Sequence, residues 1–335
     1  MSKDIRLLGE DERPLAKALW KEAFDDSDAF IDWYFKNKIF PGNSLCMFEG
    51  GALLSIVHMI PYTIRIQGRP VKSAFIAGVA TSMKMRGEGL MRTMLLESLA
   101  LLKSRGICIT HLYPFSHKFY EKFGWATYSH MSRQTVTTAS RLRGTEVIET
   151  MDADELAPLY NRMMKGFDGY VIRGKREWEW RLGELKSDGG RCALLIKNDL
   201  ACAYMLYYVT KEKAEIIETV YEDEEDIGAL LAYILSQGYG RAEYHIPSER
   251  MGSVKHGMAR IVDAKALLGA LDAQELLLHY DIVDGFATWN NTQNGCKQRM
   301  SEAELAHLVH CGKNKRDSEL GHLFAPQKTC IFEAY

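Results

Sequence analysis

The chain has 335 residues, more than one small α/β domain requires, and this length predicts two or three domains. The formal net charge is −2 and there is no long basic run, which argues against a nucleic-acid partner. No stretch approaches the ~20 apolar residues of a membrane span and the first residues lack an apolar signal segment, so we expect a cytoplasmic protein without a membrane partner. The seven cysteines are scattered without a C-x-x-C pair, so we expect reduced thiols and no metal site.

Apolar periodicity predicts the first elements of the chain. Gly50-Gly51 and Gln67-Gly68 indicate hairpin turns between strands. The predicted elements are a strand at 5–8, a helix beginning near 11–14, a helix at 26–36, and strands at 44–49, 53–62 and 71–81.

The most informative stretch is 76–92, where an apolar strand enters a basic turn with two glycines and a helix begins near Leu90. Such a turn places free backbone N–H groups at the positive end of a helix dipole, which favours a bound phosphate. Gly87 and Gly89 have no Cβ, so a diphosphate could approach the main chain, and Arg86 adds positive charge beside them. A bare Gly-x-Gly is also common in turns that only reverse the chain.

Two nucleotide-binding patterns do not fit this turn. A Rossmann site requires G-x-G-x-x-G and a later acidic residue for the ribose, and a P-loop ends in G-K-[ST]. The segment Lys84-Met-Arg-Gly-Glu-Gly89 instead resembles the acyl-CoA pyrophosphate loop of the GNAT N-acetyltransferases, [QR]-x-x-G-x-[GA]. Lys84 departs from the usual glutamine or arginine but keeps the charge.

A second segment strengthens this resemblance. After a predicted strand at 107–112, the chain reads Phe-Tyr-Glu-Lys-Phe-Gly-Trp over 119–125. GNAT enzymes carry a tyrosine on the helix at this place and continue through a [FY]-G-[FYW] turn into the next strand. Most of these aromatic residues are expected in the core, with Tyr120 as the exception. A strand at 132–139 is predicted to end the unit.

From about residue 140 a second α/β unit is predicted. It has no glycine–arginine loop comparable to 84–89, so we expect that it does not bind CoA. The final segment includes a predicted helix at 301–310 and an apolar chain end. The predicted elements of the second unit are a helix at 153–165, strands at 191–197, 200–208 and 214–221, a helix at 224–237 and a strand at 241–245.

The entire chain resembles the enhanced-intracellular-survival (Eis) family of bacterial acetyltransferases. Besides 76–92 and 116–125, the resemblance is carried by Gly-Tyr-Val-Ile-Arg and the residues after it (169–182) and by Met-Ala-Arg-Ile-Val-Asp (258–263). It implies an α/β (α+β) fold of three domains, although the last is shorter than the family's sterol-carrier-like domain. The implied domains are an N-terminal GNAT domain at 1–139, a second GNAT-like domain at 140–255 and a small sterol-carrier-protein-like domain at 256–335.

The resemblance also implies the reaction. The protein would transfer acetyl from acetyl-CoA to a primary amine of a small molecule or peptide, such as an aminoglycoside, lysine or polyamine-like acceptor, directly in a ternary complex. Tyr120 would be the general acid and the α-carboxylate of Tyr335 the general base, and relatives form hexamers, so a homo-oligomer is expected. The implied acetyl-CoA contacts are Val79, Ala80, Thr81, Arg86, Gly87, Glu88, Gly89, Leu90, Arg92 and Ser116.

The identity of the base stays open from the sequence. A solvated α-carboxyl group titrates at about 3.3–3.7, and burial in an apolar chain end would raise its pKa toward a useful range. Glu333 and a water relay are alternatives. A rival function is a non-catalytic acyl-CoA or lipid sensor on the same scaffold, but a sensor needs neither the tyrosine nor the apolar chain end.

Overall fold

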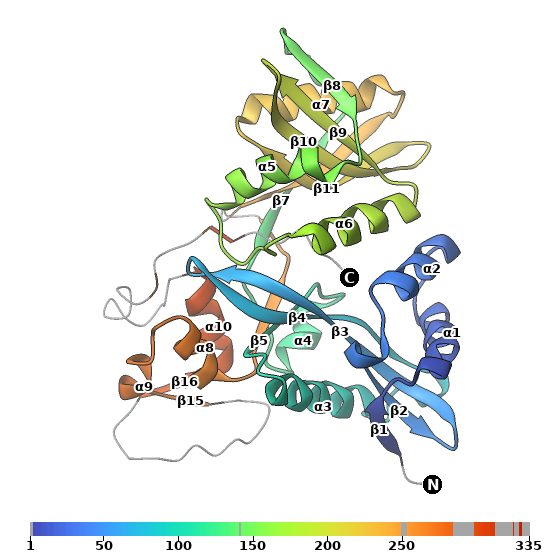
Figure 1. Cartoon of the computed structure of the whole chain (residues 1–335), viewed down its shortest axis with the longest axis vertical. Coiled ribbons are helices and arrows are strands. Elements are labelled where there is room, and N and C mark those ends of the chain that lie inside the picture. Colours follow the sequence, from blue (N-terminus) through green and yellow to red (C-terminus); the bar gives the residue numbers. More distant parts are fainter. Residues whose placement is uncertain are drawn as a thin grey trace.

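The computed structural model describes residues 3–140, 142–248, 253–283, 298–311, 324 and 328–329. Within this part of the chain, two seven-stranded sheets lie one above the other in Figure 1. We call the lower sheet with its helices the first unit and the upper sheet with its helices the second unit. The mixed α/β architecture agrees with the predicted fold class.

The first sheet is antiparallel except between β4 and β5, which run parallel. Its spatial order is β1 (Asp4–Leu7), β2 (Ser44–Glu49), β3 (Ala52–Ile66), β4 (Arg69–Thr81), β5 (Ile109–Leu112), β14 (Met258–Ile261) and β6 (Ala126–Thr127).

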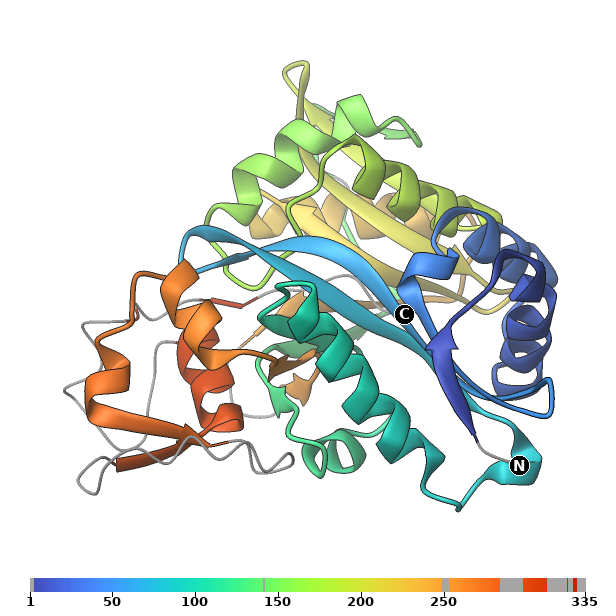
Figure 2. The ribbon, with the colours of Figure 1, turned by 60° about the horizontal axis from the view of Figure 1, so that its bottom comes forward.

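Alternation along β4 gives this sheet two buried faces, as expected for a strand covered on both sides. Phe75 and Ala77 belong to the core that includes α1 (Arg13–Ala23) and α2 (Asp28–Asn37). Ala74 and Ile76 belong to the core that includes α3 (Leu90–Ser104). Figure 2 shows α3 crossing in front of β3 and β4.

The second sheet has the same plan. One face packs on α5 (Ala153–Met164) and α6 (Lys175–Ser187), and the other on α7 (Glu224–Ser236). Its spatial order is β13 (Val254–Lys255), β7 (His130–Val136), β12 (Arg241–Pro247), β11 (Lys213–Tyr221), β10 (Leu200–Val209), β9 (Arg191–Lys197) and β8 (Thr145–Glu149).

Two strands lie in a different unit from the one that the predicted domain boundaries give them. β7 lies in the second sheet, where His245 pairs with Arg133, although the predicted boundary after residue 139 assigns this strand to the first domain. β14 lies in the first sheet beside β5, although the sequence places it in the C-terminal domain. Each sheet therefore contains a strand from outside its predicted range, and the chain passes between the two sheets twice, from β6 to β7 and from β13 to β14.

The units also meet through side chains at α2 and the residue that follows it, on one side, and α6 on the other. The Lys38 ammonium lies 2.7 Å from the Glu184 carboxylate, and both side chains are buried. At Gly183 an added Cβ would lie 2.5 Å from the Trp33 ring, so the two helices pack too closely for a side chain there.

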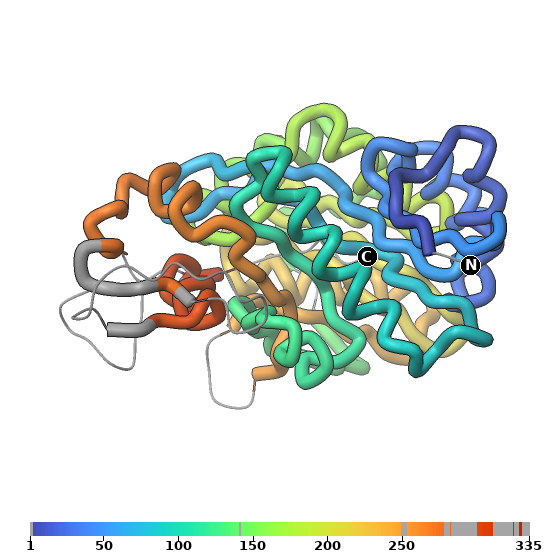
Figure 3. Tube along the Cα trace, turned by 90° about the horizontal axis from the view of Figure 1, so that it is seen from below, coloured from blue at the N-terminus to red at the C-terminus, as the bar shows by residue number. Residues whose placement is uncertain are grey.

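The C-terminal segment packs against the first unit at the left in Figure 3. Leu267 and Val309 belong to the same buried core as Phe75, and Gln67 donates a hydrogen bond to the Val309 carbonyl at 2.8 Å. No helix in the described part of the chain is long and apolar enough to span a membrane. The elements are α8 (Ala264–Ala270), α9 (Leu276–His279), β15 (Tyr280–Val283), β16 (Gln298–Ser301) and α10 (Glu302–Cys311).

Candidate active site

The first feature of the site is an opening between β4 and β5. Their parallel pairing runs from Ser73 opposite Ile109 to Phe75 opposite His111. β4 itself continues to Thr81, so its last residues diverge from β5 and their backbone groups on that side face the opening. Backbone N–H and C=O groups are strong hydrogen-bonding groups, so such an edge suits a ligand that carries amides.

A bulge turns β4 at the same place. Across from β3, Ile56 pairs with Ala80 and His58 with Ala77, so Gly78 and Val79 together oppose one residue. Gly78 has φ +52° and lies against the Trp20 ring, where an added Cβ would come within 2.1 Å. The buried indole of Trp20 and the positive φ both require glycine here.

After the bulge, the strand end is held by hydrogen bonds to its neighbours. The Ser55 hydroxyl donates to the Ala80 carbonyl at 2.8 Å and lies 2.9 Å from the Thr81 hydroxyl. Glu22 of α1 accepts hydrogen bonds from the Ser82 hydroxyl and the Met83 amide, at 3.1 and 2.5 Å. The sequence offered no signal for this role of Glu22, because it depends on a contact over about sixty residues.

The glycine loop lies at the start of α3. Gly87 and Gly89 have φ of +88° and +74°, and no described heavy atom lies within 4 Å of the place a Cβ would take at either residue. Arg86, Glu88 and the glycines are exposed, whereas Leu90, the first residue of the helix, is buried. The loop therefore leaves free space at the amino end of a 15-residue helix, where amide groups and the helix dipole favour an anion.

Positive side chains surround this loop. Lys84, Arg86 and Arg92 are all exposed, and the Arg86 guanidinium donates to the Thr81 carbonyl at 3.3 Å. The cation of Arg86 thus connects the end of the diverging strand with the loop. The cationic side chains provide positive charge, and the glycine loop and the start of α3 provide backbone N–H groups. Both are needed to bind a diphosphate.

Tyr120 lies on the short helix α4 (His117–Glu121), on the α3 side of the sheet. Its ring is buried among Phe115, Phe119 and Trp125, with centroids 5.3 to 5.9 Å away. Burial raises the pKa of the Tyr120 phenol to about 12. The phenol is therefore protonated at neutral pH and can act only as a proton donor there.

The other predicted residues fall into three groups. Val79 packs against the core that contains Tyr120 and Leu90, so the diverging strand, the helix start and the tyrosine lie on the same face of the sheet. Ser116 caps α4, where its hydroxyl accepts a hydrogen bond from the Phe119 amide at 3.3 Å. Tyr335 and Glu333, the two candidate bases, lie outside the described residues.

The second sheet opens in a similar way. β11 and β12 run parallel and pair only from Lys213 opposite Arg241 to Glu215 opposite Glu243, and both strands continue further. β11 also carries a bulge at Ile217 against β10. Strand order, divergence and bulge therefore repeat what β3, β4 and β5 show in the first sheet.

The helix after this second opening begins differently. α7 starts from Asp223 and has Glu224, Glu225 and Asp226 in its first turn, and the residues leading into it contain no glycine. Carboxylates at a helix start interact favourably with the dipole but repel a phosphate. The amino end of α7 is thus electrostatically unsuited to a diphosphate.

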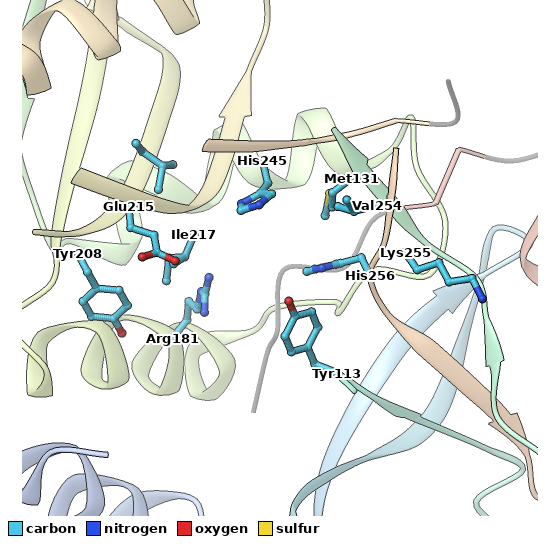
Figure 4. Close-up of a pocket in the computed structure, with 11 residues that line it drawn as sticks. Tyr113, Met131, Arg181, Tyr208, Glu215, Ile217, His245, Val254, Lys255 and His256 are labelled. Atoms are coloured by element: carbon cyan, nitrogen blue, oxygen red, sulfur yellow. The ribbon is translucent and has the colours of Figure 1, made fainter. Parts of the chain in front are cut away.

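A cavity of about 210 Å³ lies at this second opening (Figure 4). The second unit lines it with Arg181 of α6, Tyr208, Glu215 and His245. Tyr113, directly after β5, and the segment 254–256 line the remaining side. Apart from Arg181, which lies in the 169–182 segment, these residues did not stand out in the sequence, because they come from several segments spread between residues 113 and 256.

Comparison with known families decides the nature of the first unit. Residues 4–128 match a family model described as an acetyltransferase (GNAT) domain. Residues 4–128 thus form a domain of the GNAT acetyltransferase type. The predicted enzyme class, an N-acetyltransferase, and the predicted cosubstrate, acetyl-CoA, are confirmed for this domain. No curated protein matches the chain.

Solved structures share the fold over the full length. A probable N-acyltransferase of unknown function from Enterococcus faecalis has a TM-score of 0.81 at 17% identity, and a GCN5-related N-acetyltransferase from Anabaena variabilis has 0.80 at 15%. Eis1 from Mycobacterium abscessus has 0.72 at 14%. In each case the alignment covers 100% of both chains. At these identities the likeness concerns the fold.

Proposed function

We propose that the protein is an Eis-like N-acetyltransferase that transfers acetyl directly from acetyl-CoA to a primary amine within a ternary complex. The observation that carries this proposal is the divergence of β4 from β5 beside an exposed glycine loop at the start of α3. An acyl-CoA has a diphosphate at one end and an amide-containing arm at the other. The glycine loop can bind the diphosphate, and the unpaired edge of β4 can bind the amides of the arm.

In this proposal the residues of the first opening hold the cosubstrate. Val79, Ala80 and Thr81 present their backbone to the pantetheine amides. Arg86 and Arg92 add charge, and Ser116 lies at the start of the helix that carries Tyr120. The diphosphate is bound by amides of Gly87, Glu88, Gly89 and Leu90.

Tyr120 is the proposed general acid. As the amine nitrogen attacks the thioester carbon, the C–S bond breaks and the sulfur takes the phenolic proton. The raised pKa of Tyr120 keeps that proton in place before the reaction. A backbone N–H of β4 directed at the thioester oxygen would stabilise the negative charge that develops there, by about 3 kcal/mol.

The amine must lose its ammonium proton before or during attack. We propose the α-carboxylate of Tyr335 as the base, with Glu333 and a water relay as alternatives. The likeness in fold to Eis1 supports the Eis-like assignment. We further propose catalytic, GNAT-like and sterol-carrier-like domains at 1–139, 140–255 and 256–335, with β7 in the second sheet and β14 in the first, a homo-oligomeric assembly and a cytoplasmic location.

The test measures CoA release from acetyl-CoA with a panel of primary amines, including an aminoglycoside, a lysine peptide and a polyamine. We expect saturable turnover with at least one amine. The competing function is a sensor that binds acyl-CoA without chemistry. Saturable acetyl-CoA binding without release of CoA on any amine would favour the sensor.

A further inference from the structure

The cavity at the second opening lies between the second sheet and the first unit (Figure 4). β11 and β12 line it from the second sheet, and Tyr113 lines it from the first unit. Tyr113 directly follows β5, and the pairing of β4 with β5 ends at His111, two residues earlier. The cavity and the first opening therefore lie at the same end of β5.

The loop after β5 connects this cavity with the proposed acid. The Tyr113 ring lies 4.7 Å from the ring of His256, which also lines the cavity. Two residues later, the Phe115 ring lies 5.6 Å from the Tyr120 ring. Phe115 is 74% exposed, so its ring is accessible to a ligand as well. Within three residues, one loop places an aromatic ring at the cavity and another beside Tyr120.

Hydrogen bonds hold the helix that carries Tyr120 against the cavity lining. His117 Nε2 lies 3.0 Å from the His256 carbonyl oxygen, and the Lys255 ammonium lies 2.8 Å from the Glu121 carboxylate. Both helix residues lie within three positions of Tyr120. The wall of the cavity and the proposed acid are thus held in one arrangement.

Each charged side chain of the described lining already has an ion-pair partner that lies outside the lining. The pairs are Arg181 with Glu218 at 2.9 Å, Lys255 with Glu121 at 2.8 Å and Glu215 with Lys213 at 3.1 Å. A charged group of a ligand would lose its hydration on entering the cavity and would compete with these partners. The lining therefore favours an uncharged occupant.

The rest of the lining is aromatic or apolar. Burial lowers the pKa of His245 and raises the pKa of Tyr113, so both rings are uncharged at neutral pH. Aromatic rings attract another ring in offset-stacked or edge-to-face contacts. Such a wall suits an aromatic ring. The lining rings are Tyr113, Tyr208, His245 and His256, and the apolar lining residues are Met131, Ile216, Ile217 and Val254.

The size of the cavity agrees with an aromatic occupant. An apolar cavity of about 150 Å³ holds a benzene molecule. The volume here is about 210 Å³, which leaves room for one ring and part of a short chain. The acidic start of α7 makes the second opening unsuited to a second acetyl-CoA.

We propose that this cavity is the acceptor site and that it binds the aromatic ring of a primary amine, whose short chain carries the amine past Tyr113 toward the first opening. This inference rests on the proposed acetyltransferase function. The chemistry is the same: the amine nitrogen forms the bond to the acetyl carbon, and CoA leaves as the thiol. The divergent strands of the second sheet then hold the acceptor instead of a coenzyme.

The first test uses the unmodified protein and measures CoA release with 2-phenylethylamine and with n-butylamine. Both are primary amines on an unbranched chain, and only the first has a ring. We expect kcat/KM to be about tenfold higher or more for 2-phenylethylamine, because its ring leaves water for the cavity. Equal or higher values for n-butylamine would overturn the acceptor assignment and leave the acetyltransferase function intact. Absence of turnover with every amine would contradict the function itself, and the acceptor assignment with it.

The second test fills the cavity. Val254 lines it and is 47% exposed, so a larger side chain there need not disturb the core. Val254→Trp should raise KM for 2-phenylethylamine about tenfold or more and leave KM for acetyl-CoA unchanged. Leu200→Trp is the matched control and should change neither, since Leu200 is also exposed but lies at the other end of β10 from Tyr208. If Val254→Trp folds and its KM for 2-phenylethylamine is unchanged, the cavity is not the acceptor site.

The third test removes an aromatic contact without filling the cavity, and it decides the question even if Val254→Trp does not fold. Tyr113 is half exposed, so its ring can be removed with little effect on the core. Tyr113→Ala should reduce the preference for 2-phenylethylamine over n-butylamine, whereas Tyr113→Phe, which keeps the ring, should retain it. An undiminished preference in Tyr113→Ala would contradict the proposed position of the acceptor ring.

Discussion

Tyr120 is the single side chain on which the proposed chemistry depends most. Its phenol is buried by aromatic rings and its pKa is raised to about 12. Because the group stays protonated up to that pH, loss of its proton should not reduce activity anywhere between pH 7 and 10. A rise of activity with pH over this range would instead report deprotonation of the amine or of the base.

Replacement of Tyr120 by phenylalanine should lower kcat on the order of 10²-fold, the usual contribution of a general acid. The dissociation constant of acetyl-CoA should hardly change, since the phenol does not hold the diphosphate. Steady-state kinetics and calorimetry measure the two quantities.

The matched control is Tyr160→Phe, which removes another buried hydroxyl, one that donates to the Val171 carbonyl at 2.8 Å. This variant should lose stability but keep kcat. Unchanged turnover in Tyr120→Phe would remove Tyr120 from the mechanism.

At the scale of elements, most strands and helices could be predicted from local pattern. The strands at 44–49 and 191–197 have the predicted bounds, because apolar runs between turn residues define them well. α6 was not predicted as a helix, since its two tryptophans stand among charged residues and give a weak periodicity. The place of β14 beside β5 was not predicted either, because pairing between strands 150 residues apart leaves no local signal.

The same limit applies to the site. The glycine loop and Tyr120 could be selected from the sequence because both belong to short motifs. The divergence of β4 from β5 depends on which hydrogen bonds are made, and the cavity depends on packing between the units. Neither is encoded in any one segment.

The bulge in β4 gives a prediction at this scale. Gly78→Ala should lower the free energy of unfolding by about 3 kcal/mol, because the new Cβ would overlap the buried Trp20 ring and φ is positive. Chemical denaturation measures the loss.

Gly51→Ala serves as the comparison, since Gly51 also has positive φ, +82°, but open space around it. It should cost about 1 kcal/mol, the strain of the left-handed conformation alone. Equal losses in the two variants would mean that the packing of Trp20 against the bulge is unimportant.

At the scale of the whole molecule, buried histidines join the C-terminal segment to the first sheet. His111 of β5 and His310 of α10 lie 3.2 Å apart between their Nε2 atoms, and the His310 ring stacks on Tyr128. Burial lowers the pKa of His310 to about 3 and that of His111 well below its ordinary value. His58, in the same unit, has its pKa lowered by burial to about 3.

These histidines predict a loss of stability in acid. Below their ordinary pKa of about 6.5 they bind protons in the unfolded chain but not in the folded protein, so the free energy of unfolding falls as the pH decreases. Asp168 opposes this trend, because burial raises its pKa to about 7 and the folded protein binds its proton first. Among these four groups, the three histidines outweigh the one carboxyl group, so together they lower the free energy of unfolding below pH 6.

His310→Gln should make this acid dependence shallower by about 1.4 kcal/mol per pH unit between pH 4 and 6. Denaturant unfolding at a series of pH values measures the slope. An unaltered slope in His310→Gln would show that the contact between His111 and His310 does not exclude protons.

Titration of the intact protein with acetyl-CoA in a calorimeter tests the central claim most directly. The two units share divergent strands, but the glycine loop precedes α3 alone, whereas acidic residues begin α7. We therefore predict saturable binding of one acetyl-CoA per chain. Absence of heat, or two equivalent sites per chain, would contradict the account.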